Sequence, residues 1–373
     1  MIKTAIRFIL FDKPKSIGAL MGTVMSVFLI GQQCGIFIFL ISAMSALVNN
    51  NSEYIWVVDN KTTNVNALGQ IDVRIGNELQ SIAGVSSVYP MITAGVSAKF
   101  KNGTSSGMTL VGVQVPAYAG GPWDLFSGHK EAMIQDGAII TDIFDQGSLG
   151  GIEQGDAFEI NNKQVFVAAQ TKGVRSFGGI LAFTTVERAR YLGNIGTDKA
   201  NAFLVKVKDG QSMQQVIDQI NSHFFGVRAW SGAEFTRQTI YTVLKTSGIA
   251  ISFGTMIFFA LIVGFVIIGL TLYSSAIDRL KDYGTLKAIG ATNGYIRKLI
   301  LTQALIIAFA GYLVGSLVTE AFRNGIARTG TIFNYPIWMR LTFLVLTLTI
   351  ALLGSLFAIR RITRLEPGEV FRG

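Results

Sequence analysis

The chain has 373 residues, of which half are hydrophobic, with a mean hydropathy of +0.45 and a formal net charge of +9. This composition predicts a membrane protein that is large enough to carry a soluble domain as well. It excludes nucleic acid as a partner, because no basic run is interleaved with aromatic residues, and the single Cys34 excludes an intramolecular disulfide.

The charge is distributed unevenly along the chain. Residues Asn49 to Lys245 hold 16 of the 32 lysines and arginines and 17 of the 23 aspartates and glutamates, which leaves 16 basic against 6 acidic residues elsewhere. A basic excess beside apolar runs is typical of the cytoplasmic flanks of membrane spans. We therefore expect the segments outside 49–245 to lie in and beside a membrane.

Residues 1–15 predict an amphipathic helix at the cytoplasmic interface of the membrane. Its apolar face holds Ile2, Ala5, Ile6 and Ile9. We expect Pro14 to end this helix, because proline disfavours helical backbone at the residue before it. The apolar run at 16–48 is longer than the roughly 7–15 residues of a signal-peptide core, so it predicts an uncleaved first transmembrane helix.

Residues 49–245 predict a large extracytoplasmic α+β domain between the first and second spans. Two strand–helix–strand halves flank a glycine-rich middle, which indicates one core with an inserted lobe at about 119–196. The expected strands are Ile55–Asp59, Val85–Tyr89, Val96–Phe100, Met108–Val115, Ala138–Thr141, Ala157–Ile160, Val165–Ala169, Phe203–Val207 and Val227–Trp230. The expected helices are Ile71–Ala83 and Ser212–His223.

From about residue 233 the chain runs without proline into the second apolar stretch, at 246–276. As one helix, Ala233–Ala276 would be about 65 Å long at about 1.5 Å per residue, against a hydrocarbon core of about 30 Å. We therefore expect a stalk that projects from the membrane and continues into the second transmembrane helix. Two helices with a break near Ser247 and Gly248 are the alternative.

Two further apolar runs complete a layout of four spans. The expected segments are a third span at 297–322, an outer loop at 323–340, a fourth span at 341–359 and a cytoplasmic tail at 360–373. Three arginines of the outer loop, Arg323, Arg328 and Arg340, run against the positive-inside rule. The inner segments still hold more basic residues, so we expect both termini in the cytoplasm.

The segment at 277–296 is a short basic helix that joins the second and third spans at the cytoplasmic surface. Residues near helical spacing on it are Leu280, Tyr283, Leu286, Lys287 and Ile289, which predicts an apolar and a charged face. Gly284 and Gly290 permit close approach of a partner to the backbone. A plain connector, with lysines that reach toward the interface, is the alternative.

This segment resembles the loop between the second and third spans of FtsX/MacB-like ABC transporter permeases, where Glu-Arg-x-x-Glu-Ile-Gly-x-Leu-Lys-Ala-x-Gly-Ala recurs. The matching residues are Arg279, Asp282, Gly284, Leu286, Lys287, Ala288, Gly290 and Ala291. The stretch 283–291 looks most like the DevC-type branch. In the family this segment is a coupling helix that docks on a separate ATPase. The resemblance implies charged contacts by Arg279, Lys281, Asp282 and Lys287, with Leu286, Ala288 and Ile289 in the ATPase cleft.

The resemblance also implies the whole assembly. It implies the permease subunit of an ABC transporter of the mechanotransmission type, a homodimer with two ATPase subunits that use ATP and magnesium. The chain would lie among the lipids of a bacterial inner membrane and carry a MacB-like periplasmic core domain. A DevC-like affinity adds a periplasmic adaptor, an outer-membrane channel and export of a lipid or another amphiphile.

No catalytic motif accompanies this layout. There is no Walker A pattern and no nucleophile elbow, and the two histidines, His129 and His223, are too far apart in sequence to indicate a metal site. The acidic residues Asp136, Asp142, Asp145, Glu153 and Asp156 indicate a solvated surface rather than acid–base catalysis. We therefore expect a chain that is no enzyme and binds no cofactor or metal.

The energy for transport must then come from a partner, because the predicted spans hold almost no ionisable residues of the kind that ion-coupled transporters keep. The alternative function is an ATPase-independent membrane-anchored sensor or scaffold that binds an extracytoplasmic partner. That alternative does not explain the amphipathic basic helix at 277–296.

Overall fold

The computed structural model describes residues 1–11 and 13–363, and the chain forms two compact units. Among the described residues, the helical unit contains 1–38, 250–327 and 332–363. The α/β unit contains Phe39–Ile249 together with Arg328–Thr331. The short connection between the last two long helices therefore belongs to the α/β unit.

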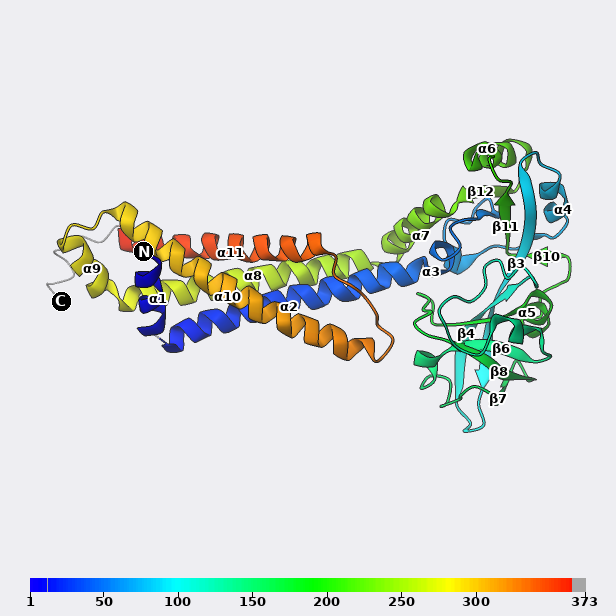
Figure 1. The fold of residues 1–373 in the computed structure, drawn as a ribbon, viewed down its shortest axis with the longest axis horizontal. Coiled ribbons are helices and arrows are strands. Elements are labelled where there is room, and N and C mark those ends of the chain that lie inside the picture. The colour runs from blue at the N-terminus through cyan, green and yellow to red at the C-terminus, as the bar shows by residue number, and fades with distance from the viewer. Residues whose placement is uncertain (12, 364–373) are drawn as a thin grey trace. The chain divides into compact units, whose positions relative to one another are not determined.

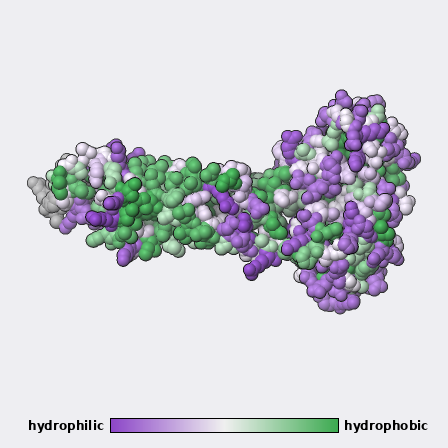
Figure 2. Space-filling model, in the orientation of Figure 1, coloured by the Kyte–Doolittle hydropathy of each residue, from purple (hydrophilic) through white to green (hydrophobic). Residues whose placement is uncertain are grey.

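Four long helices make up most of the helical unit (Figure 1): α2 (Lys13–Met44), α8 (Ile249–Asp278), α10 (Asn293–Ala327) and α11 (Ile337–Thr363). Within the described residues these four are long and apolar enough to cross a membrane. Figure 2 shows hydrophobic residues over much of the visible surface of this unit and hydrophilic residues over most of the α/β unit. The chain is a membrane protein, and the expected layout of four helices with a large α+β domain after the first is confirmed.

The predicted helix at the start of the chain is present as α1 (Ile2–Phe11), and Pro14 lies beyond it, inside the first turn of α2. Proline is tolerated there, because the first N–H groups of a helix have no intrahelical acceptor. The predicted tail, 360–373, lies mostly outside the described residues, which end at Thr363.

The predicted single helix from Ala233 to Ala276 is wrong. Helix α7 (Gly232–Ser247) ends before α8 begins, and Gly248 between them has a φ of +68°. This left-handed conformation is one that glycine adopts at a helix C-terminus with little strain. The alternative, two helices with a break near Ser247 and Gly248, is confirmed.

The α/β unit is built on a ten-stranded sheet in the order β12-β1-β11-β3-β4-β9-β6-β8-β5, with β7 beside β3 and β8. Its strands are β1 (Ile55–Asp59), β3 (Val85–Lys99), β4 (Ser105–Val113), β5 (Leu125–Ser127), β6 (Ala138–Asp142), β7 (Ala157–Ile160), β8 (Lys163–Thr171), β9 (Ile180–Thr185), β11 (Ala202–Val207) and β12 (Val227–Ser231). The helices of this unit besides α7 are α3 (Ala46–Asn49), α4 (Ile75–Gln80), α5 (Val186–Gly193) and α6 (Met213–His223). A small second sheet pairs β2 (Ile71–Asp72) with β10 (Lys199–Ala200).

Strand β3 is continuous where two strands were predicted. It passes Pro90, which cannot donate to a ladder, and Tyr89 on its first half pairs with β11. From Met91 to Lys99 the other side of the strand pairs with β4, and this pairing carries the strand onward. The sheet is therefore continuous across the whole unit, and the boundary of an inserted lobe near residue 119 stays a prediction.

The predicted helix Ile71–Ala83 is wrong over its first residues. Ile71 pairs with Ala200 in the small sheet, and the Val73 N–H donates to the Asp198 carbonyl at 2.9 Å. Only α4 remains helical, because these tertiary pairings outweigh local helix propensity.

Trp56 and Trp230 lie in the core of the α/β unit, and Trp123 packs against it. The ring centroids of Trp56 and Trp230 lie 5.9 and 6.1 Å from that of Phe235, which belongs to α7. Trp123 packs edge-on against Phe183 at 5.6 Å. The contacts of Phe235 with Trp56 and Trp230 join α7 to β1 and β12.

Candidate functional site

The coupling segment predicted from the sequence is helix α9 (Leu280–Ala288), which lies between α8 and α10 (Figure 1). Gly290 follows it with a φ of +102°. The Gly290 N–H donates to the Lys287 carbonyl at 3.0 Å, and the Ala291 N–H donates to that of Leu286 at 2.9 Å. This is a Schellman C-cap, so Gly290 serves the turn between α9 and α10.

One face of α9 packs against α1. The Arg279 side chain is buried, with its guanidinium 4.9 Å from the ring centroid of Phe8 and 5.3 Å from that of Phe11. Tyr283, one turn later, is also buried and lies 5.7 Å from Phe8. Burial raises the pKa of Tyr283. Aromatic faces attract a cation, so this contact holds α9 against the N-terminal helix.

A second contact joins α9 to the end of α11. Lys287 Nζ donates to the carbonyl oxygens of Ile362 and Thr363, both at 3.2 Å. A lysine ammonium has three N–H donors and carbonyl oxygens accept them. The Lys287 ammonium therefore links α9 to α11, a contact that the sequence did not indicate.

The opposite face of α9 is exposed. The ten predicted coupling residues divide into Arg279, Gly284, Leu286, Lys287 and Ala291, which are buried or half-buried, and Lys281, Asp282, Ala288, Ile289 and Gly290, which are exposed. The Ile289 side chain, directly after α9, has 79% of its surface exposed, and Lys281 and Asp282 in the first turn of α9 are exposed as well. An apolar side chain with a polar rim is the composition of a small protein interface. Contact of either group with an ATPase stays a prediction.

Two residues of α1 that contact this site were not identified from the sequence. Phe8 and Phe11 lie outside the apolar face predicted for residues 1–11, yet Phe8 packs between Arg279 and Tyr283. Their aromatic character was the available signal, since a phenylalanine beside a basic loop can hold a cation. Directly before Arg279, Asp278 forms an ion pair with Lys15, and this contact joins the end of α8 to α2.

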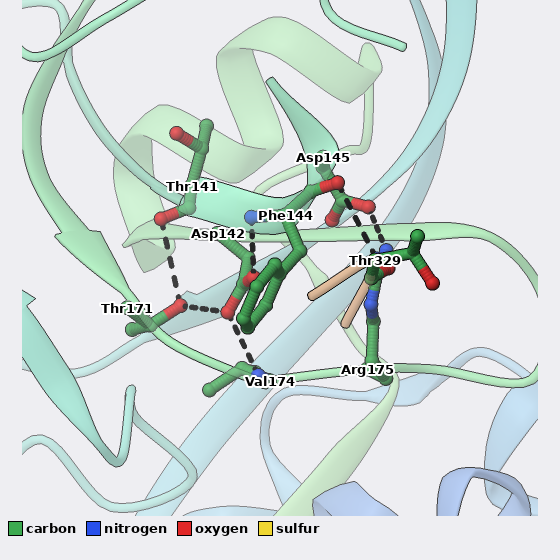
Figure 3. Close-up of polar contacts among 8 residues, drawn as sticks. All are labelled: Thr141, Asp142, Phe144, Asp145, Thr171, Val174, Arg175 and Thr329. Carbon is green, nitrogen blue, oxygen red and sulfur yellow. Dashed lines mark hydrogen bonds and ion pairs between the residues drawn. The ribbon is translucent and has the colours of Figure 1, made fainter. Parts of the chain in front are cut away.

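The α/β unit contains a second cluster, here called the arginine clamp: Asp142, Asp145, Arg175 and Thr329 (Figure 3). Arg175 forms an ion pair with Asp145 and donates to the Thr329 carbonyl at 2.9 Å. Thr329 lies in the connection between α10 and α11. The clamp therefore fixes that connection to the α/β unit.

Asp142 holds the loop that carries Arg175. Its carboxylate accepts hydrogen bonds from the N–H of Phe144 at 3.0 Å, the N–H of Val174 at 2.8 Å and the hydroxyl of Thr171 at 3.0 Å. The expectation of a solvated acidic surface is wrong for Asp142 and Asp145, whose exposed fractions are 0% and 3%. They are buried because strand β6 ends inside the unit, beside the loop after β8.

Burial also changes the titration of Asp145. Loss of water around the carboxylate raises its pKa to about 6, with a further increase from Asp142, although Arg175 favours the charged form. A carboxyl whose pKa is higher in the folded than in the unfolded chain binds more protons when folded. Its contribution to stability is therefore fully present below the unfolded pKa and is lost as the pH rises through about 6.

We expect the α/β unit to lose thermal stability between about pH 4 and pH 6 because of this group. The Asp145→Asn variant cannot titrate, so its melting temperature should vary less with pH over the same range. Thermal unfolding of the full chain in detergent, followed by tryptophan fluorescence at several pH values, measures both. An unchanged pH dependence in the variant would contradict the assignment to Asp145.

Part of the chain is similar in sequence to a known protein family. Residues 254–367 match the family described as FtsX-like permease C-terminal, a range that contains α9 and α10. An uncharacterized ABC transporter permease of Mycobacterium tuberculosis is 30% identical over 112 residues, which cover 30% of this chain and 31% of that protein. An uncharacterized ABC transporter permease of Methanocaldococcus jannaschii is 26% identical over 236 residues, 60% of this chain and 58% of that protein. The match therefore spans under a third of the mycobacterial relative's length.

Two solved structures resemble the α/β unit at low sequence identity. The periplasmic region of MacB from Actinobacillus actinomycetemcomitans aligns with a TM-score of 0.39 at 11% identity, covering 52% of this chain and 93% of that one. The extracellular domain of the noncanonic ABC-type transporter YknZ from Gram-positive bacteria aligns with a TM-score of 0.36 at 12% identity, covering 48% and 98%.

Proposed function

We propose that this chain, whose residues 254–367 form an FtsX-like permease domain, is the membrane subunit of an ABC transporter of the mechanotransmission type. A permease homodimer binds two copies of a separate ATPase, which uses ATP and magnesium. The chain itself is not catalytic and binds no cofactor. It lies in a bacterial inner membrane with both termini in the cytoplasm.

The observation that carries this proposal is the division of α9 into two faces. The inner face is held by α1 through Arg279 and by α11 through Lys287, while the outer face presents Ile289 to solvent. A protein that moves the outer face therefore also moves α1 and α11. This is the mechanical property that a coupling helix requires, and a plain connector has no need of it.

The chain passes between the two units through segments of different secondary structure. Helix α2 is continuous from Lys13 to Met44 and passes the boundary between the units, whereas α7 and α8 are separated at Gly248. The connection after α10 is held by Arg175. In the proposed mechanism α2 transmits axial motion, Gly248 acts as the hinge and the arginine clamp holds the connection that follows α10.

Export of a lipid or another amphiphile, through a periplasmic adaptor and an outer-membrane channel, is the most specific part of the proposal. It is supported by the DevC-like sequence at 283–291. The second candidate function is an ATPase-independent sensor or scaffold. The large α/β unit fits it equally well, but it gives no role to the exposed face of α9.

Purification of the full-length chain from its native membranes in mild detergent tests the proposal. We expect a Walker-type ATPase to co-purify and to hydrolyse ATP, with mass spectrometry to identify it. An adaptor in the same preparation would support export, and its absence would favour signal transmission. If no ATPase binds under conditions that preserve the dimer, the sensor or scaffold function replaces the permease function.

A further inference from the structure

A groove of about 500 Å³ lies between α2, α10 and α11 in the helical unit. Its walls are mostly apolar and include Val27, Leu317 and Phe343. Its polar residues include Glu320 and Arg340, which come from the C-terminal part of α10 and the first turn of α11. The groove therefore combines a long apolar surface with a charged end.

The groove opens toward the surroundings of the helices. The Leu317 side chain, in its wall, has 71% of its surface exposed, and Trp338, two residues before Arg340 in α11, is exposed as well. The Tyr312 hydroxyl donates to the Arg340 carbonyl at 2.9 Å. Tryptophan and tyrosine concentrate where hydrocarbon meets headgroups. The charged end therefore lies at headgroup depth and the apolar walls at acyl-chain depth.

The charged end has a surplus of positive charge. Glu320 pairs with Arg323 at 2.6 Å, while the Arg340 guanidinium lies 3.8 Å from its other oxygen and is about half exposed. Two guanidinium groups thus share one carboxylate. Arg340 is the more weakly held of the two, which leaves most of its donors available. A planar guanidinium matches the oxygens of a phosphate group.

We propose that this groove binds an anionic phospholipid, with an acyl chain along Val27, Leu317 and Phe343 and the phosphate at Arg340 and Arg323. This explains why arginines lie at the end of the spans where the positive-inside rule disfavours them. The inference requires only that these helices span a bilayer. It is independent of an ATPase, an adaptor or transport.

A second copy of the chain fits the groove less well. Packing of another apolar helix over it would remove water from Glu320 and Arg340, and burying charges without complete pairing is costly. A lipid headgroup leaves the same side chains hydrated and adds a charge of the opposite sign. The charge of the groove therefore favours the lipid.

The test uses the full-length protein in nanodiscs of equal parts phosphatidylglycerol and phosphatidylcholine. After transfer to detergent, native mass spectrometry counts the lipids that the protein retains. We expect retention of phosphatidylglycerol over phosphatidylcholine by the wild type. The Arg340→Glu variant should lose this preference by about tenfold, the scale of one charge-assisted hydrogen bond.

Two further variants separate a specific site from general effects. Ser316→Trp places a large side chain in the groove and should abolish retention without a change of charge. Arg328→Glu reverses the charge of an exposed arginine that lies in the connection between α10 and α11. Arg328 does not line the groove, so lipid retention should be unchanged. Thermal unfolding of each variant checks that it is folded.

Equal retention of the two lipids by the wild type, or the same retention in all variants, would overturn the proposal in favour of ordinary surrounding lipid. Disulfide cross-linking between two Ser316→Cys chains in the nanodisc would overturn it in favour of a second copy.

Discussion

Replacement of Ile289 by aspartate is expected to weaken binding of the proposed ATPase by about thirtyfold or more. Burial of an isoleucine side chain contributes about 1.5–3 kcal/mol, and the aspartate adds an uncompensated charge in the contact, so a loss of about 2 kcal/mol or more is expected. The fold should be unaffected, because the Ile289 side chain is 79% exposed. The amount of co-purified ATPase and the ATPase activity are compared between the variant and the wild type, using equal amounts of folded protein.

Two control variants define what this experiment reports. Phe225→Asp changes a side chain that is 97% exposed in the α/β unit, and we expect normal ATPase binding. Leu286→Asp changes a half-buried residue that packs with Tyr283, so it should disturb the helical unit itself. If Ile289→Asp binds the ATPase as well as the wild type does, α9 does not dock through its exposed face.

Replacement of Asp142 by alanine is expected to destabilise the α/β unit by about 3 kcal/mol or more. The substitution removes the acceptor for two N–H groups and one hydroxyl, and each buried donor left unpaired costs about 1–3 kcal/mol. For a unit of this size, the melting temperature should fall by about 10 °C. Trp56, Trp123 and Trp230 lie in this unit, so tryptophan fluorescence of the full chain reports its unfolding.

Asp136→Ala is the matched control. Its carboxylate is 96% exposed and pairs with Arg188 at the surface, so its loss should change stability by less than about 1 kcal/mol. Equal effects of Asp136→Ala and Asp142→Ala would contradict the structural role of Asp142. Because Asp142 positions the loop before Arg175, Asp142→Ala should also release the Thr329 connection, which faster proteolysis after Arg328 would detect.

The sequence alone was informative where a pattern is local. Hydropathy identified four helices, because about 20 apolar residues in a row have few other stable environments. Short strand-forming runs between turn residues located β1 and β7 at the bounds that the structure shows. The residues of 279–291 indicated a permease family, and the match over 254–367 agrees.

The sequence was less informative where a segment far away in the chain determines how far a strand runs or whether a side chain is buried. A proline ends many strands, yet β3 passes Pro90 because β4 pairs with it beyond that point. Acidic residues in a glycine-rich stretch usually lie in solvent, yet Asp142 is buried because Thr171 and Val174 come to it from another strand and its loop.

For the candidate site, the sequence by itself determined that 277–296 contains a helix with two faces between two spans. Only the tertiary structure decided which face is free. Periodicity placed Tyr283, Leu286 and Ile289 near helical spacing with Leu280 and Lys287. The partners that cover Tyr283 and Leu286 come from α1 and α11, far away in the chain, whereas Ile289 is exposed. The predicted contact of Lys287 with an ATPase stays a prediction; the structure adds that its ammonium donates to carbonyls of α11, a pairing that depends on where the fold brings α11.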